Sequence, residues 1–448
     1  MSHSKSKIQH PKSPLPRYER YKDSGVEWLG EVPEHWEVRR NLGVFDERKE
    51  CNQPTAELLS VTVSQGIIRQ SEITAKKDSS NDDKSKYKVV RIGDLAYNKM
   101  RAWQGALGIS AFNGIVSPAY VVLTPRNQKL SKYFHYLYRT PQFITEANRL
   151  SYGLCDDMNS LRYEHFKTSY SPLPPDDEID RIVAFLDQKT AEIDALITKK
   201  QRQIELLDEQ KAILINRAVT RGLKPNTKLK PSGIEWIGEI PAHWEVLQLR
   251  RLQRYGTSIT YGIVQAGPDI EDGIPYIRTS DMKGREFGHS GFLKTSHKID
   301  NAYRRSKVEE GDLVIAIRAT LGKALRVPSH LHGANLTQGT AKVAPGPKLN
   351  SKFLVYAFNS SYCQEAVLFV GKGTTFLEIT LEALRRIQLV VPPIAEQIKI
   401  VGTIERAVAL HRESVGLTLN EIQSLKTLRS TLIAHAVTGR LKVNSLLK

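Results

Sequence analysis

The sequence predicts a mixed α/β protein in which two related domains are separated by an antiparallel pair of long coiled-coil helices, arranged as a pseudo-twofold internal repeat. Three observations predict this fold class: a tryptophan-containing motif that occurs twice, two long helical segments, and short β-rich runs between them. A chain of 448 residues is long enough for about three units, each with a core of its own.

The duplicated motif begins at residues 24 and 232. The first copy is SGVEWLGEVPEHWEV and the second is SGIEWIGEIPAHWEV, so eleven positions are identical. Four of the five tryptophans of the chain fall in these two copies. Since large aromatic side chains gain most from burial, we expect the motif to pack at the entrance of each domain and to fix the direction of the chain there.

Each helical segment follows a proline pair, Pro174-Pro175 and Pro392-Pro393. Neither Gly nor Pro occurs from about Asp176 to Thr220, and apolar residues recur there at 3.5-residue spacing, as in a coiled coil. A helix of about 44 residues is roughly 66 Å long, so we expect the two helices to pack on each other and to hold the domains apart. The predicted helix-pair packing residues are Ile193, Ile197, Ile204, Leu207 and Leu214 in the first helix and Val415, Ile422, Leu425 and Leu432 in the second.

The two ends of the chain resemble a cut in a circular design. Residues 441–448 resemble residues 223–230, which lead into the second copy of the tryptophan motif. The corresponding continuation of the C-terminal copy is found at the N-terminus, at residues 22–28. The order of elements is therefore motif, variable domain and long helix, twice over.

These marks predict the domain boundaries. Gly93-Asp94-Leu95 corresponds to Gly311-Asp312-Leu313 at the 218-residue spacing of the proline pairs, so the two variable domains are expected to share a fold. The predicted segments are a flexible basic tail at 1–20, a first domain with its motif at 21–172, a first long helix at 173–223, a linker and second domain with its motif at 224–390, and a second long helix with a C-terminal tail at 391–448.

The composition indicates a polyanionic partner. The chain has 65 Lys and Arg against 48 Asp and Glu, a formal charge of +17, and a pI near 9.6. Cations that neutralise phosphates release condensed counterions, so double-stranded DNA is the expected partner. The sequence has no apolar run of membrane-spanning length and no signal peptide, which predicts a cytoplasmic protein without a membrane partner. Three widely spaced cysteines without zinc-ligand spacing predict no metal site.

Clusters of basic, amide, hydroxyl and aromatic residues are the candidate DNA contacts, because such side chains recognise base edges and phosphates. One cluster follows the Gly-Asp-Leu landmark of the first domain, and others lie in the second domain, where glycines would allow a close approach of the backbone to phosphate. The candidates are Tyr97, Asn98, Lys99, Arg101, Trp103 and Gln104 in the first domain, and Tyr276, Arg278, Thr279, Arg318, Thr320, Lys323, Lys372 and Thr374 in the second.

Taken together, the duplicated motif, the two proline pairs with their long helices and the Gly-Asp-Leu landmarks resemble a specificity subunit of a type I restriction-modification system. The resemblance covers essentially the whole chain and implies two target-recognition domains, each of which recognises one half of a bipartite, asymmetric DNA site, with the helices setting the spacer. It implies two methyltransferase (M) subunits and two restriction and translocase (R) subunits as partners. It also implies that S-adenosylmethionine, ATP and Mg bind to those partners, with no cofactor in this chain.

One departure from the family concerns the start of the first helix. The second copy has Glu396-Gln397 after its prolines, as in the family's Pro-Pro-x-x-Glu-Gln pattern, whereas the first copy has Glu178-Ile179. The contacts made by the glutamine are therefore not expected to be the same in the two copies.

Two alternatives to a non-catalytic DNA-recognition subunit remain open at this stage. Asp269, Asp281 and Lys283 match the carboxylates and lysine of a Mg-dependent endonuclease, although Asp281 also suits the cap of a turn. A coiled-coil scaffold without sequence recognition would explain the helices but not the variable domains. No Asn/Asp-Pro-Pro-aromatic loop of an amino methyltransferase and no phosphate-binding Gly-x4-Gly-Lys-Ser/Thr motif is present.

Overall fold

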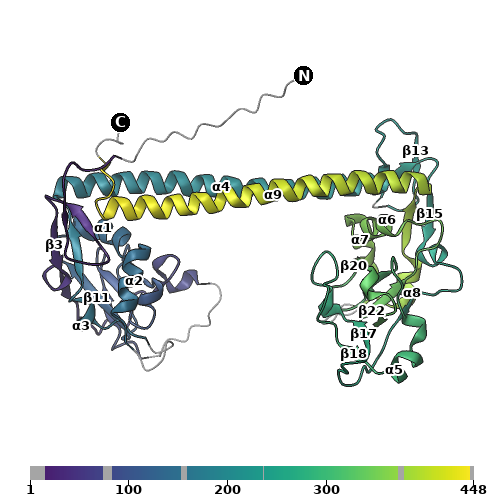
Figure 1. Ribbon diagram of the computed structural model, residues 1–448, viewed down its shortest axis with the longest axis horizontal. Helices are drawn as coiled ribbons and strands as arrows, with labels where there is room; N and C mark the ends of the chain where they lie inside the picture. Colours follow the sequence, from purple (N-terminus) through teal and green to yellow (C-terminus); the bar gives the residue numbers. More distant parts are fainter. Residues whose placement is uncertain (1–15, 74–82, 153–158, 236, 372–377, 444–448) are drawn as a thin grey trace. The chain divides into compact units, whose positions relative to one another are not determined.

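The computed structural model describes residues 16–73, 83–152, 159–235, 237–371 and 378–443 (Figure 1). The chain divides into two compact units. Unit 1 comprises Met1–Lys200 and Asn420–Lys448, and unit 2 comprises Gln201–Leu419, so each unit contains one variable domain and part of each long helix. The predicted mixed α/β class is confirmed, and both long helices are present.

Unit 1 is built on a four-stranded antiparallel sheet in the order β4-β11-β8-β9. Its β-structure is completed by four strand pairs, namely β1-β2, β3-β12, β5-β6 and β7-β10. The strands are β1 (Tyr21–Asp23), β2 (Glu31–Pro33), β3 (Glu37–Arg40), β4 (Phe45–Glu47), β5 (Leu59–Thr62), β6 (Gly66–Arg69), β7 (Lys88–Val90), β8 (Leu95–Asn98), β9 (Leu107–Ile109), β10 (Gly114–Val116), β11 (Tyr120–Pro125) and β12 (Tyr170–Leu173). The helices are α1 (Leu130–Leu137), α2 (Pro141–Arg149), α3 (Tyr163–Phe166) and the beginning of α4 (Asp176–Arg221).

Unit 2 repeats the central sheet with the order β16-β22-β19-β20. It adds a three-stranded sheet, β18-β17-β21, in which β17 and β21 are parallel. The strands are β13 (Leu229–Pro231), β14 (Glu239–Pro241), β15 (Glu245–Gln248), β16 (Thr260–Tyr261), β17 (Ile274–Ile277), β18 (Lys294–Thr295), β19 (Leu313–Ala316), β20 (Ala324–Arg326), β21 (Asn335–Leu336), β22 (Thr340–Val343) and β23 (Gln388–Val391). The helices are α5 (His297–Ala302), α6 (Ser351–Phe358), α7 (Ser361–Val370), α8 (Leu381–Arg386) and the larger part of α9 (Ile394–Val437). The end of α4 also belongs to unit 2, and the end of α9 belongs to unit 1.

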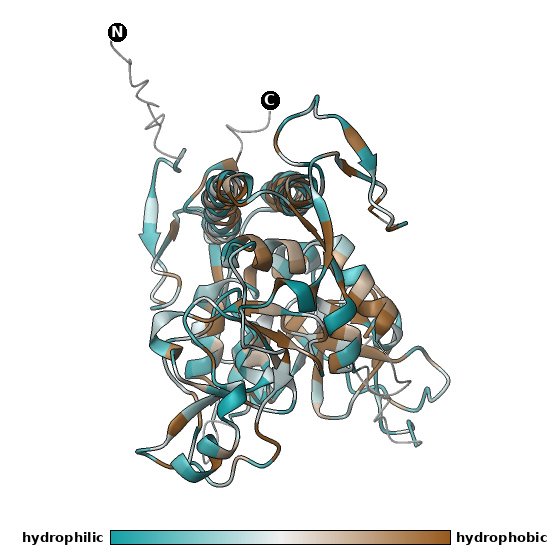
Figure 2. Ribbon diagram, turned by 90° about the vertical axis from the view of Figure 1, so that its right-hand side faces the viewer, coloured by the Kyte–Doolittle hydropathy of each residue, from teal (hydrophilic) through white to brown (hydrophobic). Residues whose placement is uncertain are grey.

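Burial follows the apolar pattern of the sequence. In unit 1, buried aromatic rings from the sheet and from α1, α2 and α3 form the core, including Phe45, Phe134, Tyr138, Phe143 and Phe166. Figure 2 shows that hydrophobic stretches fall largely on strands and helices, whereas the connecting loops are mostly hydrophilic. Within the described ranges, none of the helices has an apolar stretch long enough to cross a bilayer.

Side-chain pairs between the long helices occur in both units. In unit 1, Arg429 lies 3.0 Å from Asp194, and Lys200 lies 2.6 Å from Glu421. In unit 2, the His411 ring lies 3.1 Å from Asp208. The residue number on α9 falls as the number on α4 rises, which is the order expected of antiparallel neighbours.

The expected packing positions differ in exposure. Ile193 and Ile422 are buried, whereas Leu214 is 37% exposed. Close to Leu214, Ile215 packs against the core of unit 2 instead. The remaining positions are half-buried, namely Ile197, Ile204, Leu207, Val415, Leu425 and Leu432.

The tryptophan motif of unit 1 is hydrogen-bonded to the first turn of α4. The carboxylate of Glu178 accepts hydrogen bonds from the Trp36 indole at 2.9 Å and the Tyr18 hydroxyl at 2.8 Å, and it lies 2.7 Å from the His35 ring. Trp36 is fully buried. Burial opposes ionisation of Glu178, but the hydrogen bonds from Trp36, His35 and Tyr18 outweigh it and hold the pKa of this carboxyl below its usual value.

In unit 2 the second copy of the motif is bound in the same way to the first turn of α9. The Glu396 carboxylate lies 2.7 Å from the His243 ring and accepts a hydrogen bond from the buried Trp244 indole at 3.0 Å. The two helix starts differ at the next residue. Gln397 is fully buried and bonds the backbone at Asn350, Lys348 and Pro392, whereas Ile179 packs in the apolar core of unit 1.

Each motif also contacts the end of a long helix. Both helices end next to a glycine with positive φ, Gly222 at 74° and Gly439 at 75°. A Cβ on Gly222 would lie 3.1 Å from the Trp244 ring, and one on Gly439 would lie 2.2 Å from the Pro33 ring. The C-terminal segment therefore packs on the N-terminal motif within unit 1, and the linker packs on its own motif within unit 2 (Figure 1).

We expect Glu178→Gln to destabilise unit 1 by about 1.5–3 kcal/mol at pH 7, because the replaced carboxylate accepts hydrogen bonds as a charged group. The pKa of Glu178 is lowered in the folded chain, so its contribution is fully present above the unfolded value near 4.3 and is lost as the pH falls through the folded value. Denaturant unfolding of the wild type and the variant between pH 7 and pH 3 measures this difference.

Asp180→Asn is the matched control, since Asp180 is an exposed carboxylate on the same helix. Its effect should stay within about 0.5 kcal/mol. An equal loss in both variants, or a difference between wild type and Glu178→Gln that persists unchanged at pH 3, would contradict the role assigned to Glu178.

Candidate nucleic-acid interface

The two central sheets present equivalent edges. In unit 1, β8 ends at Asn98 opposite Tyr120, where β11 begins. In unit 2, β19 ends at Ala316 opposite Thr340, where β22 begins. The candidate segments 99–104 and 318–323 therefore leave the same end of the same strand in each domain. Because both segments follow equivalent strands, they lie a similar number of residues after the Gly-Asp-Leu landmarks.

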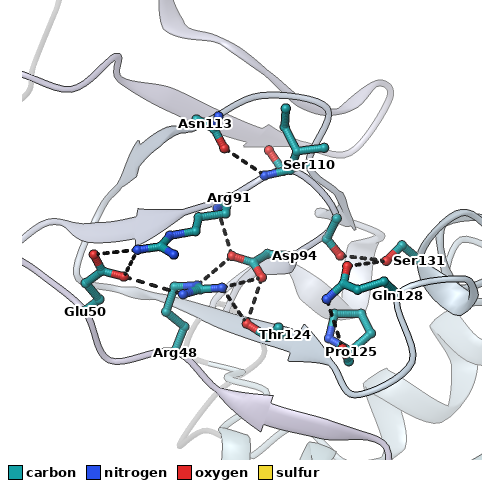
Figure 3. A network of polar contacts seen from close by, with 12 residues as sticks. Arg48, Glu50, Arg91, Asp94, Ser110, Asn113, Thr124, Pro125, Gln128 and Ser131 are labelled. Carbon is teal, nitrogen blue, oxygen red and sulfur yellow. Dashed lines mark hydrogen bonds and ion pairs between the residues drawn. The ribbon is translucent and has the colours of Figure 1, made fainter.

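The Asp94 landmark fixes the start of β8 through a buried network (Figure 3). The Asp94 carboxylate accepts hydrogen bonds from the Arg48 guanidinium at 2.7 and 3.1 Å, from the Thr124 hydroxyl at 2.8 Å and from the Arg91 backbone at 2.8 Å. Asp94 is 1% exposed. Its hydrogen bond raises the pKa of Arg48, which holds this ion pair charged. The network joins β4, β8 and β11 ahead of the candidate segment.

Unit 2 contains a smaller version of this network. The buried Asp312 carboxylate accepts hydrogen bonds from Arg254 at 2.7 Å and from the Glu309 backbone at 2.9 Å. Burial raises the pKa of Asp312 despite these partners. Gly93 and Gly311 precede the two aspartates with φ of 89° and 88°, so each landmark is a turn that favours glycine.

The first-domain candidates divide into surface and structural residues. Tyr97 was expected to contact DNA but is 1% exposed. Both faces of β8 are covered, since Leu95 and Tyr97 lie in one apolar cluster and Ala96 in another, so Tyr97 is a core residue. The half-buried Trp103 donates its indole N–H to the Met100 carbonyl within its own turn. Arg101 and Gln104 are exposed, and Asn98 and Lys99 are half-buried at the sheet edge.

The second-domain candidates are largely occupied by contacts within the chain. Tyr276 is buried in β17 at 5% exposure, which corrects its assignment as a surface contact. Arg278 is paired with Asp281 through two hydrogen bonds, of 3.0 and 2.8 Å, and Arg318 is paired with Glu378 at 2.8 Å. Thr320 is exposed, whereas Lys372 and Thr374 lie outside the described residues.

The fold brings together two clusters that are about 40 residues apart in the sequence. Lys323 donates from its ammonium group to the Lys283 carbonyl at 2.8 Å. Half-buried Thr279 approaches the turn before β22 so closely that a Cβ on Gly339 would lie 3.1 Å from its methyl group. The segments that follow β17 and β19 therefore form one surface of unit 2.

The arrangement of the carboxylates does not support the endonuclease alternative. Besides the guanidinium of Arg278, Asp281 accepts a hydrogen bond from the Arg278 backbone at 2.9 Å, which confirms that it caps a turn. Asp269 accepts a hydrogen bond from the Lys294 backbone at 2.7 Å. In the part of the chain that the structure describes, no group of three or more His, Cys, Asp or Glu residues is placed to hold a metal ion.

Residues 262–422 match the family model described as the type I restriction modification DNA specificity domain. The chain is 22% identical to the putative type I restriction enzyme MjaX specificity subunit of Methanocaldococcus jannaschii, over 93% of this chain and 96% of that protein. It is 25% identical to the type I restriction enzyme EcoBI specificity subunit of Escherichia coli, over 70% and 67% of the two chains.

Solved structures show the same fold. A chain from a study of complex assembly and conformational transition of the type I R-M system has a TM-score of 0.67 at 16% identity, covering 92% of this chain and 99% of that chain. The HsdS subunit of Thermoanaerobacter tengcongensis has a TM-score of 0.52 at 16% identity, covering 92% and 98%. The sequence and fold comparisons together confirm the resemblance predicted from the duplicated motif.

We expect Arg48→Ala to destabilise unit 1 by about 3–5 kcal/mol, because it leaves the Asp94 carboxylate buried without its cation. Arg126→Ala is the matched control, since Arg126 pairs with Asp46 and both side chains are more than half exposed. Its loss should be at most about 1 kcal/mol. Denaturant unfolding compares the two variants, and equal losses would refute the structural role of the buried network.

Proposed function

We propose that the chain is a specificity subunit of a type I restriction-modification system, which recognises a bipartite, asymmetric duplex DNA site and assembles the complex around it. The family match over residues 262–422 and the similarity to specificity subunits over most of the chain support this proposal. Specificity subunits recognise DNA sequences and are not enzymes, since catalysis lies on partner subunits. We therefore prefer sequence-specific DNA recognition to the endonuclease and scaffold alternatives.

The proposal depends on one repeated interaction, the hydrogen bond from Trp36 to Glu178 and from Trp244 to Glu396. It ties each variable domain to the start of one long helix in the same way. The equivalent sheet edges then carry different side chains, Asn98 and Arg101 in one domain and Arg318 and Thr320 in the other. Equivalent placement with different chemistry is what two different half-sites require.

We infer that α4 and α9 form an antiparallel coiled coil that sets the spacer between the half-sites. The ion pair between Asp194 and Arg429 in unit 1 and the contact of Asp208 with His411 in unit 2 support this register. Apolar seams with polar positions at intervals are typical of coiled coils that specify one register. In this arrangement the half-sites would lie about one helical turn of DNA apart.

The remaining partners follow from the family. We propose that two M subunits bind the helical regions and that two R subunits complete the restriction complex. S-adenosylmethionine, ATP and Mg would then bind to those partners rather than to this chain. The net charge of +17 supports the contact with DNA, since cations around the base-reading residues position the duplex through its phosphates.

The first experiment is co-expression with the methyltransferase subunit encoded beside this chain, in a host that lacks adenine methylation, followed by mapping of methylated bases. We expect a two-part motif with a fixed gap and one methyladenine in each half, on opposite strands. Co-expression without the specificity subunit is the control and should give no such motif. Association of the two proteins without sequence-specific methylation would overturn recognition but keep assembly.

The second experiment inserts one heptad into α4 and one into α9, at matched positions that preserve the seam. We expect the same two half-sites with a longer gap, because the recognition surfaces are unchanged while the helices are about 10 Å longer. Methylation mapping measures the gap directly. A changed half-site, or an unchanged gap in a folded and methylating complex, would contradict the spacer role.

A further inference from the structure

A hollow lined by both polar and apolar side chains lies at the sheet edge of the first domain. It has a volume of about 630 Å³ and is lined by β5, by the 3-10 turn η2 (Gln70–Glu72), by the turn after β8 and by the start of β11. The polar side chains at this hollow include Ser60, Gln70, Asn98, Arg101, Ser117 and Tyr120. Of these, only Asn98 and Arg101 are in the sequence cluster after the Gly-Asp-Leu landmark.

Arg101 supplies a positive charge at this hollow that is not neutralised by an ion pair. Its side chain is exposed, and within the described ranges its guanidinium has no ion-pair partner. The contrast with unit 2 is clear, because Arg278 and Arg318 are each paired with a carboxylate. An unpaired guanidinium offers donors in a fixed fork, which suits the paired acceptors of guanine.

Tyr120 lies directly opposite Asn98 where β11 pairs with β8. The Asn98 carbonyl oxygen accepts a hydrogen bond from the Met100 backbone at 3.0 Å, which fixes this side chain at the sheet edge. Burial raises the pKa of Tyr120, so its hydroxyl stays protonated at neutral pH. The hydroxyl can therefore donate a hydrogen bond to a ligand.

Gln70 is hydrogen-bonded to Ser60. The Ser60 hydroxyl donates to the Gln70 side-chain carbonyl across the β5-β6 hairpin. This bond uses the amide oxygen, so the amide nitrogen of Gln70, which lines the hollow, is available as a donor. Arg101, Tyr120 and Gln70 thus come from three separate segments and carry one charged and two neutral groups.

We propose that this hollow is the part of the first domain that recognises base edges in the major groove, with Gln70, Arg101 and Tyr120 as specificity-determining residues. This assignment rests on the proposed function. Ser60 and Asn98 act as positioning residues, Ser60 through its hydrogen bond to Gln70 and Asn98 through its place directly opposite Tyr120. The occupant is a set of base edges rather than a phosphate, since a phosphate contact adds charge without needing oriented amide and hydroxyl groups.

The test is methylation mapping, as above, with Gln70→Ala, Arg101→Ala and Tyr120→Phe in the full chain. Each variant should relax one base position in one half-site and leave the other half-site and the gap unchanged. Discrimination at that position should fall about 10- to 100-fold, the contribution of one good base contact. Asn98→Ala should relax the same base as Tyr120→Phe, which a purely structural role would not do.

Gln65→Ala is the matched control, because Gln65 is an exposed glutamine in the β5-β6 turn and does not line the hollow. Unfolding curves establish that each variant is folded. If the wild type gives a bipartite motif and all three variants give the same motif unchanged, the assignment of these residues is overturned and the proposed function stands. Loss of methylation equally at every sequence would identify phosphate contacts and also overturn it, while absence of a motif in the wild type would overturn both.

Discussion

The joint between a tryptophan motif and a helix start is the constraint on which the rest of the structure depends. A carboxylate in the first turn, Glu178 or Glu396, is held by a buried indole and a histidine ring from a segment more than 140 residues away in the sequence. Such charge-assisted bonds have a narrow geometry, so the direction of each long helix is set relative to its own domain. The carboxylate also lies in the first helical turn, where the helix dipole favours negative charge.

The same joint explains how a chain with two free ends behaves as a repeat. In unit 2 the motif follows directly from the end of α4, whereas in unit 1 it meets the end of α9 through contacts between the chain termini. Tyr21 donates to the Gly439 carbonyl, and the Lys442 backbone donates to the Pro16 carbonyl. Noncovalent packing thus replaces the linker, because buried aromatic and glycine contacts need proximity rather than chain continuity.

Structural and recognition roles are separated within each domain. The buried aspartates Asp94 and Asp312 are hydrogen-bonded at the starts of β8 and β19, and the segments beyond the sheet edge are left to vary. In unit 1 this leaves Arg101 unpaired among the described residues, while in unit 2 the equivalent segment pairs Arg318 with Glu378. A rigid sheet with variable edge loops allows different DNA contacts without a new fold.

The sequence by itself determined the repeat, the long helices and the mixed α/β class, because duplication and periodicity are local properties of the chain. It also singled out Arg101, whose exposure the fold preserves. Only the tertiary structure decided which candidates face outward. Tyr97 is buried because apolar clusters cover both faces of β8, and Tyr276 is buried in β17. Gln70 and Tyr120 were missed because they are distant from the landmark and approach Arg101 only when the strands pair, a long-range contact that no local pattern encodes.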